Sequence, residues 1–293
     1  MHNSNYRKAL FASERIHIDF SVLDANFVFY LGRVNYSRAH EPLRDHIHDG
    51  MMEIVLIVKG RQVYTVGGVN HTVKSGELFV TLPDELHSTG HYPEDKSLLY
   101  YFILKPDKIL KSLFGESTEG KALINELTGI DKRVYYASPK LKEILDGIIA
   151  VYHSEFRFKK TAIRNLVSEF LLDVTECMKA DTSSSVLQMQ PVLQFIDENI
   201  REELPINQLA GIVNLSSARF KMNFRKEVGI PPREYILRQK VETAKIMLQN
   251  SDKSITDIAY HLSFSSSQYF STVFKRYTYT NPLKYRIKAA APF

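Results

Sequence analysis

The last 90 residues of the chain contain one pattern twice, and this repeat constrains the fold more than any other feature of the sequence. The first copy includes NLSSARFKMNFRKEVGIPPREY, residues 214–235, and the second includes HLSFSSSQYFSTVFKRYTYTNPLKY, residues 261–285. At an offset of 49 residues, the matching positions are Ile206/Ile255, Leu209/Ile258, Ala210/Ala259, Leu215/Phe264 and Ser216/Ser265. At an offset of 50, they are Phe220/Phe270, Phe224/Phe274, Arg225/Lys275, Pro232/Pro282 and Tyr235/Tyr285. Two copies are too few for a stacked solenoid, so the repeat predicts a pair of similar folded units.

Each copy has the pattern of a helix, a short turn and a second helix. In the first copy, an apolar stripe is formed by Ile206, Leu209, Ala210 and Val213. Asn214 stands where the chain would reverse, because asparagine tolerates the left-handed backbone conformation. Ser216 is expected to cap a second helix that buries Phe220 and Phe224. This pattern predicts a helix-turn-helix, whose second helix can enter the major groove of DNA.

The outward faces of the two second helices carry small, hydroxyl, amide and cationic side chains and no acidic residue. The first face consists of Ser217, Ala218, Lys221, Met222 and Arg225, and the second of Ser267, Gln268, Ser271, Thr272 and Lys275. Such groups can contact phosphates and base edges, and Gln268 can bridge adenine with two hydrogen bonds. Most polar helix faces are only solvated. Two of them on paired helix-turn-helix units predict that these residues bind double-stranded DNA.

The distribution of charge supports a polyanionic partner for the same region. Residues 1–186 hold 23 Lys and Arg against 24 Asp and Glu, a net charge of −1. Residues 204–293 hold 14 against 5, a net charge of +9. A basic domain beside a neutral one is typical of nucleic-acid binding. The helix between the copies, about 17 residues at about 1.5 Å each, spans about 25 Å. With the flanking helices, this predicts reading helices one DNA turn apart, about 34 Å.

The front of the chain changes from strand patterns to helix patterns near Pro106. Short runs of β-branched and aromatic residues, separated by turn residues, predict strands at 15–20, 26–32, 53–60, 61–68, 77–83 and 97–106. Apolar residues then recur every three or four positions, which predicts helices at 107–114, 119–128, 138–156 and 160–178. Ser138 is expected to cap a helix that begins with Pro139. Closely spaced strands indicate an antiparallel sandwich or barrel, so the expected fold class is α+β with two domains.

The domain boundary is expected at a serine-rich stretch without periodicity. We assign residues 1–178 to the first domain, 179–186 to a linker and 187–293 to the second, all-α domain. No apolar run approaches the roughly 18 residues of a membrane span, and the N-terminus lacks the pattern of a signal peptide. The single cysteine, Cys177, excludes an internal disulfide. The expected compartment is therefore the cytoplasm, with no membrane partner.

The last 90 residues resemble the DNA-binding domain of AraC/XylS-family bacterial transcription regulators, a homeodomain-like pair of helix-turn-helix units. The resemblance is carried by LAGIVNLSSARFKMNFRKEVGIPPREYILRQKVETAKIML and SITDIAYHLSFSSSQYFSTVFKRYTYTNPLKYR. Two positions depart from the family pattern. Ser263 stands where the family has glycine before the phenylalanine of the second turn. Thr278 and Tyr279 stand where it has a Phe-Gly pair at the end of the second reading helix.

In the front domain, HIHDGMMEIVLIVKG, residues 46–60, and LPDELHST, residues 82–89, have spacings similar to the two motifs of the cupin barrel. The first motif has His40 in place of its leading glycine, and in the second the histidine comes one place early. Their candidate site residues are His46, His48, Glu53 and His87, and on a barrel strand residues 46 and 48 would point to the same side. Three histidines and a carboxylate can bind a catalytic metal, line an effector pocket or join strands as structural residues. The resemblance implies the second role, because regulators of this family carry a cupin-like β-barrel with packed helices that binds a metabolite, here without a metal.

The resemblance thus implies an effector-responsive activator of a catabolic operon, with a sugar as the expected effector and no catalytic residues or cofactor. It also implies RNA polymerase as a partner and a homodimer formed by the first domain. The apolar face of Leu166, Phe170 and Val174 fits either the intramolecular core or such a dimer interface. Two other functions stay open from the residues alone. One is a metal-dependent cupin enzyme fused to a DNA-binding module, and the other is a protein whose helix pairs bind protein.

Overall fold

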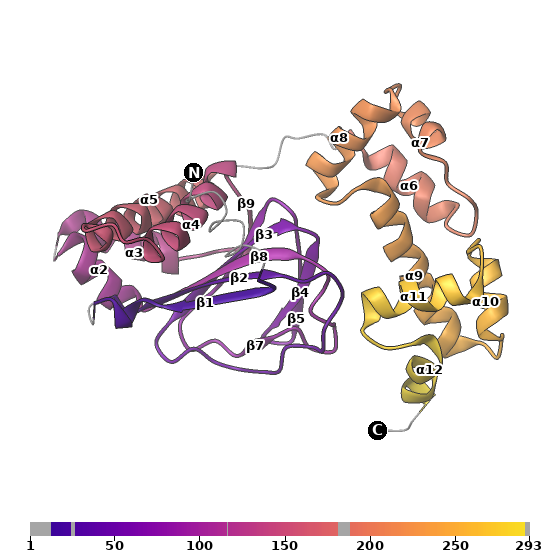
Figure 1. Cartoon of the computed structure of the whole chain (residues 1–293), viewed down its shortest axis with the longest axis horizontal. Helices are drawn as coiled ribbons and strands as arrows, with labels where there is room; N and C mark the ends of the chain where they lie inside the picture. Colours follow the sequence, from indigo (N-terminus) through magenta and orange to yellow (C-terminus); the bar gives the residue numbers. More distant parts are fainter. Residues whose placement is uncertain (1–12, 25–26, 116, 181–187, 291–293) are drawn as a thin grey trace. The chain divides into compact units, whose positions relative to one another are not determined.

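The computed structural model describes residues 13–24, 27–115, 117–180 and 188–290, so positions 181–186 of the expected linker, 179–186, lie outside the described residues. The chain divides into two compact units. The first, called the sheet unit, comprises Met1–Tyr36, Leu43–Tyr92 and Ser97–Ser184. The second, called the helical unit, comprises Ser185–Phe293 together with two short segments, Ser37–Pro42 and Pro93–Lys96. The predicted α+β class, with a sheet-rich front and a helical back, is confirmed (Figure 1).

The strands of the sheet unit are β1 (Arg15–Asp19), β2 (Phe29–Asn35), β3 (Met52–Lys59), β4 (Arg61–Val66), β5 (Val69–Lys74), β6 (Glu77–Thr81), β7 (His87–Ser88), β8 (Leu98–Leu104) and β9 (Val134–Tyr136). Among the described residues, they form a six-stranded sheet in the order β1-β2-β8-β3-β6-β9 and a three-stranded sheet in the order β5-β4-β7. Neighbouring strands pair antiparallel. The arrangement is a pair of sheets rather than a closed barrel.

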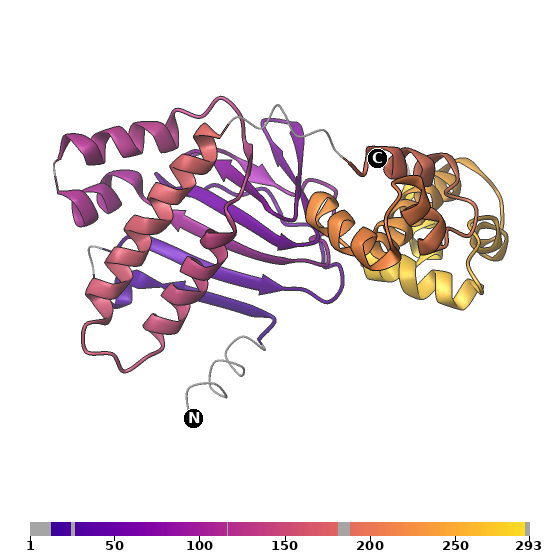
Figure 2. The same ribbon diagram turned by 90° about the horizontal axis from the view of Figure 1, so that it is seen from above.

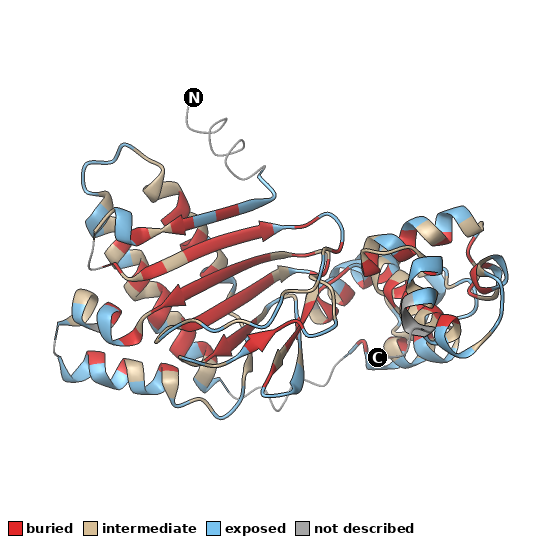
Figure 3. Cartoon of the chain, turned by 90° about the horizontal axis from the view of Figure 1, so that it is seen from below, coloured by how far each residue is buried: buried red, intermediate tan, exposed pale blue. Residues whose placement is uncertain are grey.

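The central strands of the six-stranded sheet are buried on both faces, which explains why β3 and β8 read as continuous apolar runs. On β8, Tyr100, Phe102 and Leu104 pack into one core, whereas Leu99, Tyr101 and Ile103 pack into another. The second core also contains Tyr64, Val66 and Val73 from the three-stranded sheet, so it fills the space between the sheets. Buried residues accordingly line the strands (Figure 3).

Helices cover the other face of the six-stranded sheet (Figures 1 and 2). The short helix η1 is Phe20–Val22, and the longer ones are α2 (Pro106–Phe114), α3 (Thr118–Thr128), α4 (Pro139–Tyr152) and α5 (Lys159–Lys179). Ser138 caps α4 as predicted, with its side chain accepting a hydrogen bond from the Lys140 amide. Phe170 and Val174 of α5 are buried in this core, so the intramolecular alternative is correct for these two residues.

The helical unit contains α6 (Gln190–Glu198), α7 (Ile206–Ile212), α8 (Ser217–Val228), α9 (Pro232–Asn250), α10 (Ile255–His261), α11 (Ser267–Thr278) and α12 (Pro282–Ala290). Helix α9 contributes to two separate cores. Its first half packs Ile236 with α6, α7 and α8, and its second half packs Val241, Ala244 and Leu248 with α10 and α11. It therefore joins two similar helix-turn-helix units. No helix in the described ranges of the chain is both long and apolar enough for a membrane span.

Candidate nucleic-acid interface and effector site

The first reading helix, α8, begins and ends as the sequence pattern predicts. Asn214 has a φ of 53°, the left-handed conformation expected at the turn. Ser216 caps the helix by accepting a hydrogen bond from the Arg219 amide, and Gly229 ends it with a φ of 86°. Phe220 and Phe224 are fully buried. These contacts fix both the ends of α8 and the face that it turns to solvent.

The residues predicted to read DNA lie on that solvent face. Ala218, Lys221, Met222 and Arg225 are exposed, and Ser217 is half-buried. Helix α11 repeats the arrangement: Gln268, Thr272 and Lys275 are exposed, and Ser267 and Ser271 are half-buried. On its inner side, α11 buries Phe270, Val273 and Phe274. Neither predicted face is thus packed into the core. No acidic residue lies within the first turn of either helix, where phosphates can approach a positive helix end.

At both positions that depart from the family pattern, the backbone adopts a left-handed conformation. Ser263 has a φ of 53° and Tyr279 a φ of 56°, although neither is glycine. The hydroxyl of Ser263 donates a hydrogen bond to the Arg201 carbonyl, a contact that glycine could not make. Beside Tyr279, the Thr278 hydroxyl lies 2.8 Å from the Phe274 carbonyl and 2.9 Å from the Thr280 carbonyl. Local hydrogen bonds therefore accompany the strained backbone at both sites.

A buried lysine ties the two helix-turn-helix units together. Lys240 lies on the stripe of α9 that also includes Ile236, Ala244 and Leu248, four residues apart. Its ammonium donates to the Glu202 carbonyl at 2.9 Å, before α7, and to the Leu262 carbonyl at 2.6 Å, after α10. Burial lowers the pKa of Lys240. The ammonium thus satisfies carbonyls from both units at once, which favours one fixed spacing between them.

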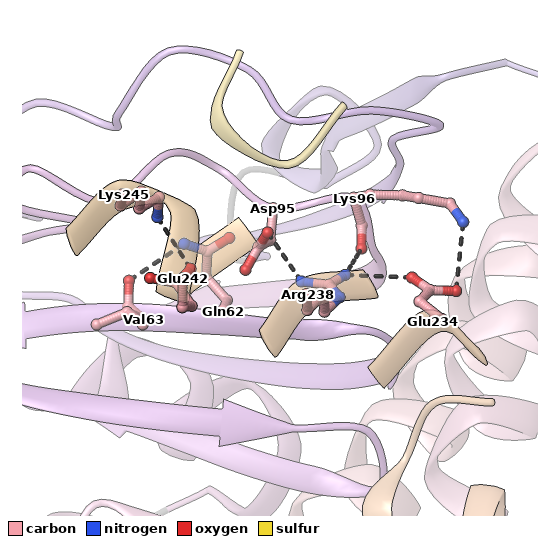
Figure 4. Close-up of polar contacts among 8 residues, drawn as sticks. All are labelled: Gln62, Val63, Asp95, Lys96, Glu234, Arg238, Glu242 and Lys245. Atoms are coloured by element: carbon pink, nitrogen blue, oxygen red, sulfur yellow. Dashed lines mark hydrogen bonds and ion pairs between the residues drawn. The ribbon is translucent and has the colours of Figure 1, made fainter. Parts of the chain in front are cut away.

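A second buried cation on α9 contacts the short segment Pro93–Lys96 of the same unit. The Arg238 guanidinium lies 2.9 Å from the Asp95 carboxylate and 3.3 Å from that of Glu234 (Figure 4). It also donates to the Lys96 carbonyl at 3.0 Å, while the Lys96 ammonium lies 3.3 Å from Glu234. Arg238 is only 3% exposed, so these ion pairs are shielded from solvent. Each partner is needed, because an unpaired buried charge is costly.

The sheet unit brings the predicted effector residues together in one place, which we call the His/Glu cluster: His46, His48, Glu53 and His87. One ligand atom of each lies within 4.8 Å of those of the others. His46 and His87 are backbone partners in an isolated antiparallel bridge, with amide-to-carbonyl distances of 3.0 and 3.1 Å. His46 and His48 were expected on a regular strand, and this detail was wrong: they lie in a loop segment before β3. The cross-strand bridge positions them instead.

The Glu53 carboxylate is the buried centre of the cluster. Its Oε2 lies 3.1 Å from His87 Nε2 and 3.8 Å from His48 Nε2. Burial alone would raise the pKa of Glu53, but the interactions with His48 and His87 outweigh it and lower the pKa to about 2. Burial would lower the pKa of His87, but Glu53 and the Glu85 carbonyl outweigh it and raise the pKa. The carboxylate therefore stays ionised and attracts cationic groups.

A cavity of about 820 Å³ has a wall of polar and apolar residues, several of which are chain neighbours of the cluster residues. It is lined by Asp45, Thr65, Val66, Gly67, Gly68, Val69, His71, Glu85, Leu86, Ser88 and Arg133. Asp45 directly precedes His46, and Leu86 and Ser88 flank His87. Within the wall, Arg133 donates two hydrogen bonds to the Glu85 carboxylate. The wall thus offers hydroxyl, carboxylate, imidazole and guanidinium groups to a hydrogen-bonding ligand.

Sequence reasoning missed several residues that the structure places at these sites. Nothing in the sequence indicated that Arg133 lines the cavity, because it belongs to a loop far along the chain from the cupin-like motifs. Arg219 and Tyr269 are exposed on α8 and α11 beside the predicted faces. The burial of Lys240 could have been predicted from the sequence, because Lys240 occurs at the four-residue spacing of the apolar stripe of α9. A cationic residue on an apolar stripe is expected to form its hydrogen bonds in the protein interior rather than at the surface.

Two family models match the chain. The model described as an AraC-like ligand binding domain matches residues 29–167, and the model described as a helix-turn-helix domain matches residues 209–288. The first match covers strands β2 to β9, α2, α3, α4, the His/Glu cluster and the cavity, but not β1. The second covers α8, α9, α10 and α11. The candidate effector site therefore lies in the region matched by the ligand binding domain, and the candidate reading helices lie in the region matched by the helix-turn-helix domain.

Several known proteins resemble most or part of the chain. The HTH-type transcriptional activator RhaS of Escherichia coli O157:H7 is 24% identical over 237 residues, covering 79% of this chain and 83% of RhaS. The structure of ToxT from Vibrio cholerae is 16% identical, with a TM-score of 0.36, and the match covers 90% of this chain and 100% of that one. An AraC-type regulator of Chromobacterium violaceum is 26% identical, with a TM-score of 0.35, and the match covers 36% of this chain and 95% of that one.

Proposed function

The chain belongs to the AraC/XylS family of transcription regulators, and from this premise we propose that it binds specific duplex DNA through α8 and α11 and responds to a small effector. The observation that carries the proposal is the pair of solvent-facing reading helices held on one connecting helix, in a region of net charge +9. Cationic and hydrogen-bonding side chains on both helices fit phosphates and base edges. The chain acts as a regulator rather than an enzyme.

We propose further that the chain activates transcription in the cytoplasm, as a homodimer in contact with RNA polymerase. The name of the relative RhaS, a transcriptional activator, supports activation. A homodimer would present four reading helices, two from each copy, to two half-sites. The controlled genes would encode catabolism of the effector, with carbohydrate as the favoured class.

The effector is proposed to occupy the cavity beside the His/Glu cluster. Hydroxyl, carboxylate and guanidinium groups in the wall favour a polyhydroxylated ligand over an apolar one. Only six residues separate Ser88 in the wall from Asp95, and Asp95 pairs with Arg238 of α9. A ligand that moves the start of this segment can therefore alter the contact on α9. The change in the free energy of DNA binding would equal the difference between the ligand's binding free energies for the two arrangements of the protein.

DNA binding is tested by reversing the charge of Lys221 and Arg225 together. Fluorescence polarisation with duplexes from the chain's own upstream region should show specific binding by the unmodified protein. The double variant Lys221→Glu, Arg225→Glu should bind at least about 100-fold more weakly, with a salt slope reduced by about 2. The matched control, Lys108→Glu with Lys111→Glu on α2, changes net charge equally at exposed positions of the sheet unit. Unchanged binding by the α8 variant would refute this interface.

The effector response is tested separately with Asp95→Asn. A thermal-shift screen of sugars and sugar acids first identifies a ligand of the unmodified chain. The variant should bind that ligand with unchanged affinity, because Asp95 lies outside the cavity wall, but the ligand should no longer change DNA affinity. Asp107→Asn, at an exposed position of α2, serves as the control. An unchanged DNA response in Asp95→Asn would show that this segment does not carry the effector signal.

A further inference from the structure

We propose that the His/Glu cluster binds one divalent transition-metal ion. This inference goes beyond the proposed function, because metal binding by the cluster requires neither DNA nor an effector. It also departs from the expectation that the family resemblance implied, an effector pocket without a metal. The reason lies in the orientation of the imidazoles and in the contacts that they lack.

The first argument is the identity and closeness of the donors. Three imidazoles and one carboxylate offer ligand atoms within 4.8 Å of one another. Ligands of a zinc ion, at bond lengths of about 2.0–2.1 Å, lie roughly 3.3 Å apart in a tetrahedral site. The distance between Glu53 and His87, 3.1 Å, is already close to this value, and that between Glu53 and His48 is 3.8 Å. Imidazole and carboxylate together suit Zn, Fe, Ni and Mn.

The second argument is that two of the histidines are held through Nδ1 by backbone carbonyls, which leaves Nε2 as the atom that can bind a metal ion. The Nδ1 atoms of His46 and His87 lie 2.9 and 2.8 Å from the carbonyls of Arg44 and Glu85. A carbonyl only accepts, so Nδ1 carries a proton in both rings. In neutral His46 this leaves the Nε2 lone pair free, whereas His87 Nε2 donates to the Glu53 carboxylate at 3.1 Å and would release that proton to a metal ion. Metal-binding histidines show this pattern, in which the second nitrogen donates to a carbonyl that fixes the ring. Both carbonyls belong to the residue two positions earlier in the chain.

The third argument is an unsatisfied atom inside the cluster. Nε2 of His48 is buried and has no hydrogen-bond partner among the described residues. Its nearest charged neighbour is the Glu53 carboxylate at 3.8 Å, beyond hydrogen-bond distance. Buried polar atoms normally have a partner, and a cation between this imidazole nitrogen and the buried carboxylate would supply one. One ion would satisfy His48 and Glu53 together.

The ion would also connect three segments of the chain. The segment from Arg44 to His48 and strand β7 meet through the bridge of His46 and His87, and Glu53 comes from β3. Asp45, Leu86 and Ser88, which neighbour these ligands in the chain, line the cavity. A bound ion would therefore fix part of the cavity wall, and its loss would loosen that wall while leaving the helical unit unchanged.

The test uses the full chain without an affinity tag, stripped with a chelator and then incubated with Zn²⁺ or Co²⁺. After gel filtration, mass spectrometry should find one ion per chain, and bound Co²⁺ should give the visible d–d absorption of a low-coordinate site. Metal should raise the melting temperature of the sheet unit by about 5 °C or more. DNA binding is measured on the same samples, so that failure of the metal site is distinguished from failure of the reading helices.

Variants assign the ion to the cluster. His48→Ala, at the more accessible edge, and Glu53→Gln should each weaken metal binding at least about 10-fold. His91→Ala, at an exposed histidine outside the cluster, should bind like the unmodified chain. If Glu53→Gln does not fold, His48→Ala decides the result alone. Absence of retained metal in the unmodified chain overturns the proposal, and so does equal metal binding by His48→Ala.

Discussion

The two helix-turn-helix units make the same backbone turns with different residues. The first unit uses Asn214 and Gly229 at its left-handed positions, with φ of 53° and 86°. The second uses Ser263 and Tyr279, with φ of 53° and 56°. Because the same turns form with and without glycine, the packing of both units on α9 must determine the backbone path. Asparagine and glycine lower the free-energy cost of the left-handed backbone in the first unit. In the second unit, which lacks them at these positions, side-chain hydrogen bonds offset that cost.

The reading helices of the two units also differ in charge. The predicted face of α8 carries two cations, Lys221 and Arg225, whereas that of α11 carries one cation, Lys275, with an amide and several hydroxyls. Cations contribute mainly through phosphates, and amides contribute through base edges. The first unit is therefore suited to supply affinity and the second to supply sequence selectivity.

The largest expected effect comes from breaking the link between the units. In Lys240→Met, the carbonyls of Glu202 and Leu262 lose a buried charged donor. We expect the free energy of unfolding of the helical unit to fall by about 3 kcal/mol. Urea denaturation followed by far-ultraviolet circular dichroism measures this change. Lys253→Met, at an exposed position after α9, should stay within about 0.5 kcal/mol of the unmodified chain. Equal stability of the two variants would mean that the units are not linked through Lys240.

The proposed roles of α8 in affinity and of α11 in sequence selectivity are tested with one substitution in each helix. Arg225→Ala should weaken binding to all duplexes alike and lower the salt slope by about 0.9. Gln268→Ala should leave the slope unchanged but reduce discrimination at one base pair by about 2 kcal/mol. Fluorescence polarisation at several salt concentrations, with the operator and singly substituted duplexes, separates these outcomes. Selectivity lost in Arg225→Ala and retained in Gln268→Ala would reverse the assignment.

The helical unit was more predictable from sequence than the His/Glu cluster, for a physical reason. The cap at Ser216 and the turn at Asn214 depend on contacts within a few residues, and the spacing of Phe220 and Phe224 by four residues marks the buried face of α8. Local chemistry determines such features, so the pattern of residue types reveals them. The same holds for the apolar strands at the centre of the six-stranded sheet.

Features that depend on long-range pairing were not predictable. Strand β5 was missed because only Val73 on it is buried, which leaves no alternating pattern. The bridge of His46 and His87 depends on the register of segments about forty residues apart, which no local pattern encodes. The pairing of Arg238 with Asp95 spans a still longer stretch of chain. Ion pairs of this kind leave no periodic signal in the sequence.

A smaller effect is expected where the first unit relies on glycine. Gly229→Ala forces a Cβ into the left-handed conformation and should lower the free energy of unfolding by about 1.5 kcal/mol. Gly211→Ala provides a control of opposite sign, because Gly211 lies within α7 with open space around its Cβ direction. There, alanine should raise stability by about 0.5–1 kcal/mol. Chemical denaturation of both variants measures the contrast, and a shared sign would rule out the conformational explanation.

The smallest effect is expected at the corresponding position of the second unit. Tyr279→Gly removes a left-handed strain of about 1–2 kcal/mol, but glycine also gains about 0.5–1 kcal/mol of conformational entropy in the unfolded chain. The net stabilisation should be about 0.5 kcal/mol. Tyr279→Ala keeps the strain while removing the ring, so the difference between the two variants isolates the backbone contribution from side-chain packing. If chemical denaturation finds Tyr279→Ala as stable as Tyr279→Gly, the left-handed backbone costs little there, and the hydrogen bonds of Thr278 hold the turn. Glycine would then be a preference of the turn rather than a requirement.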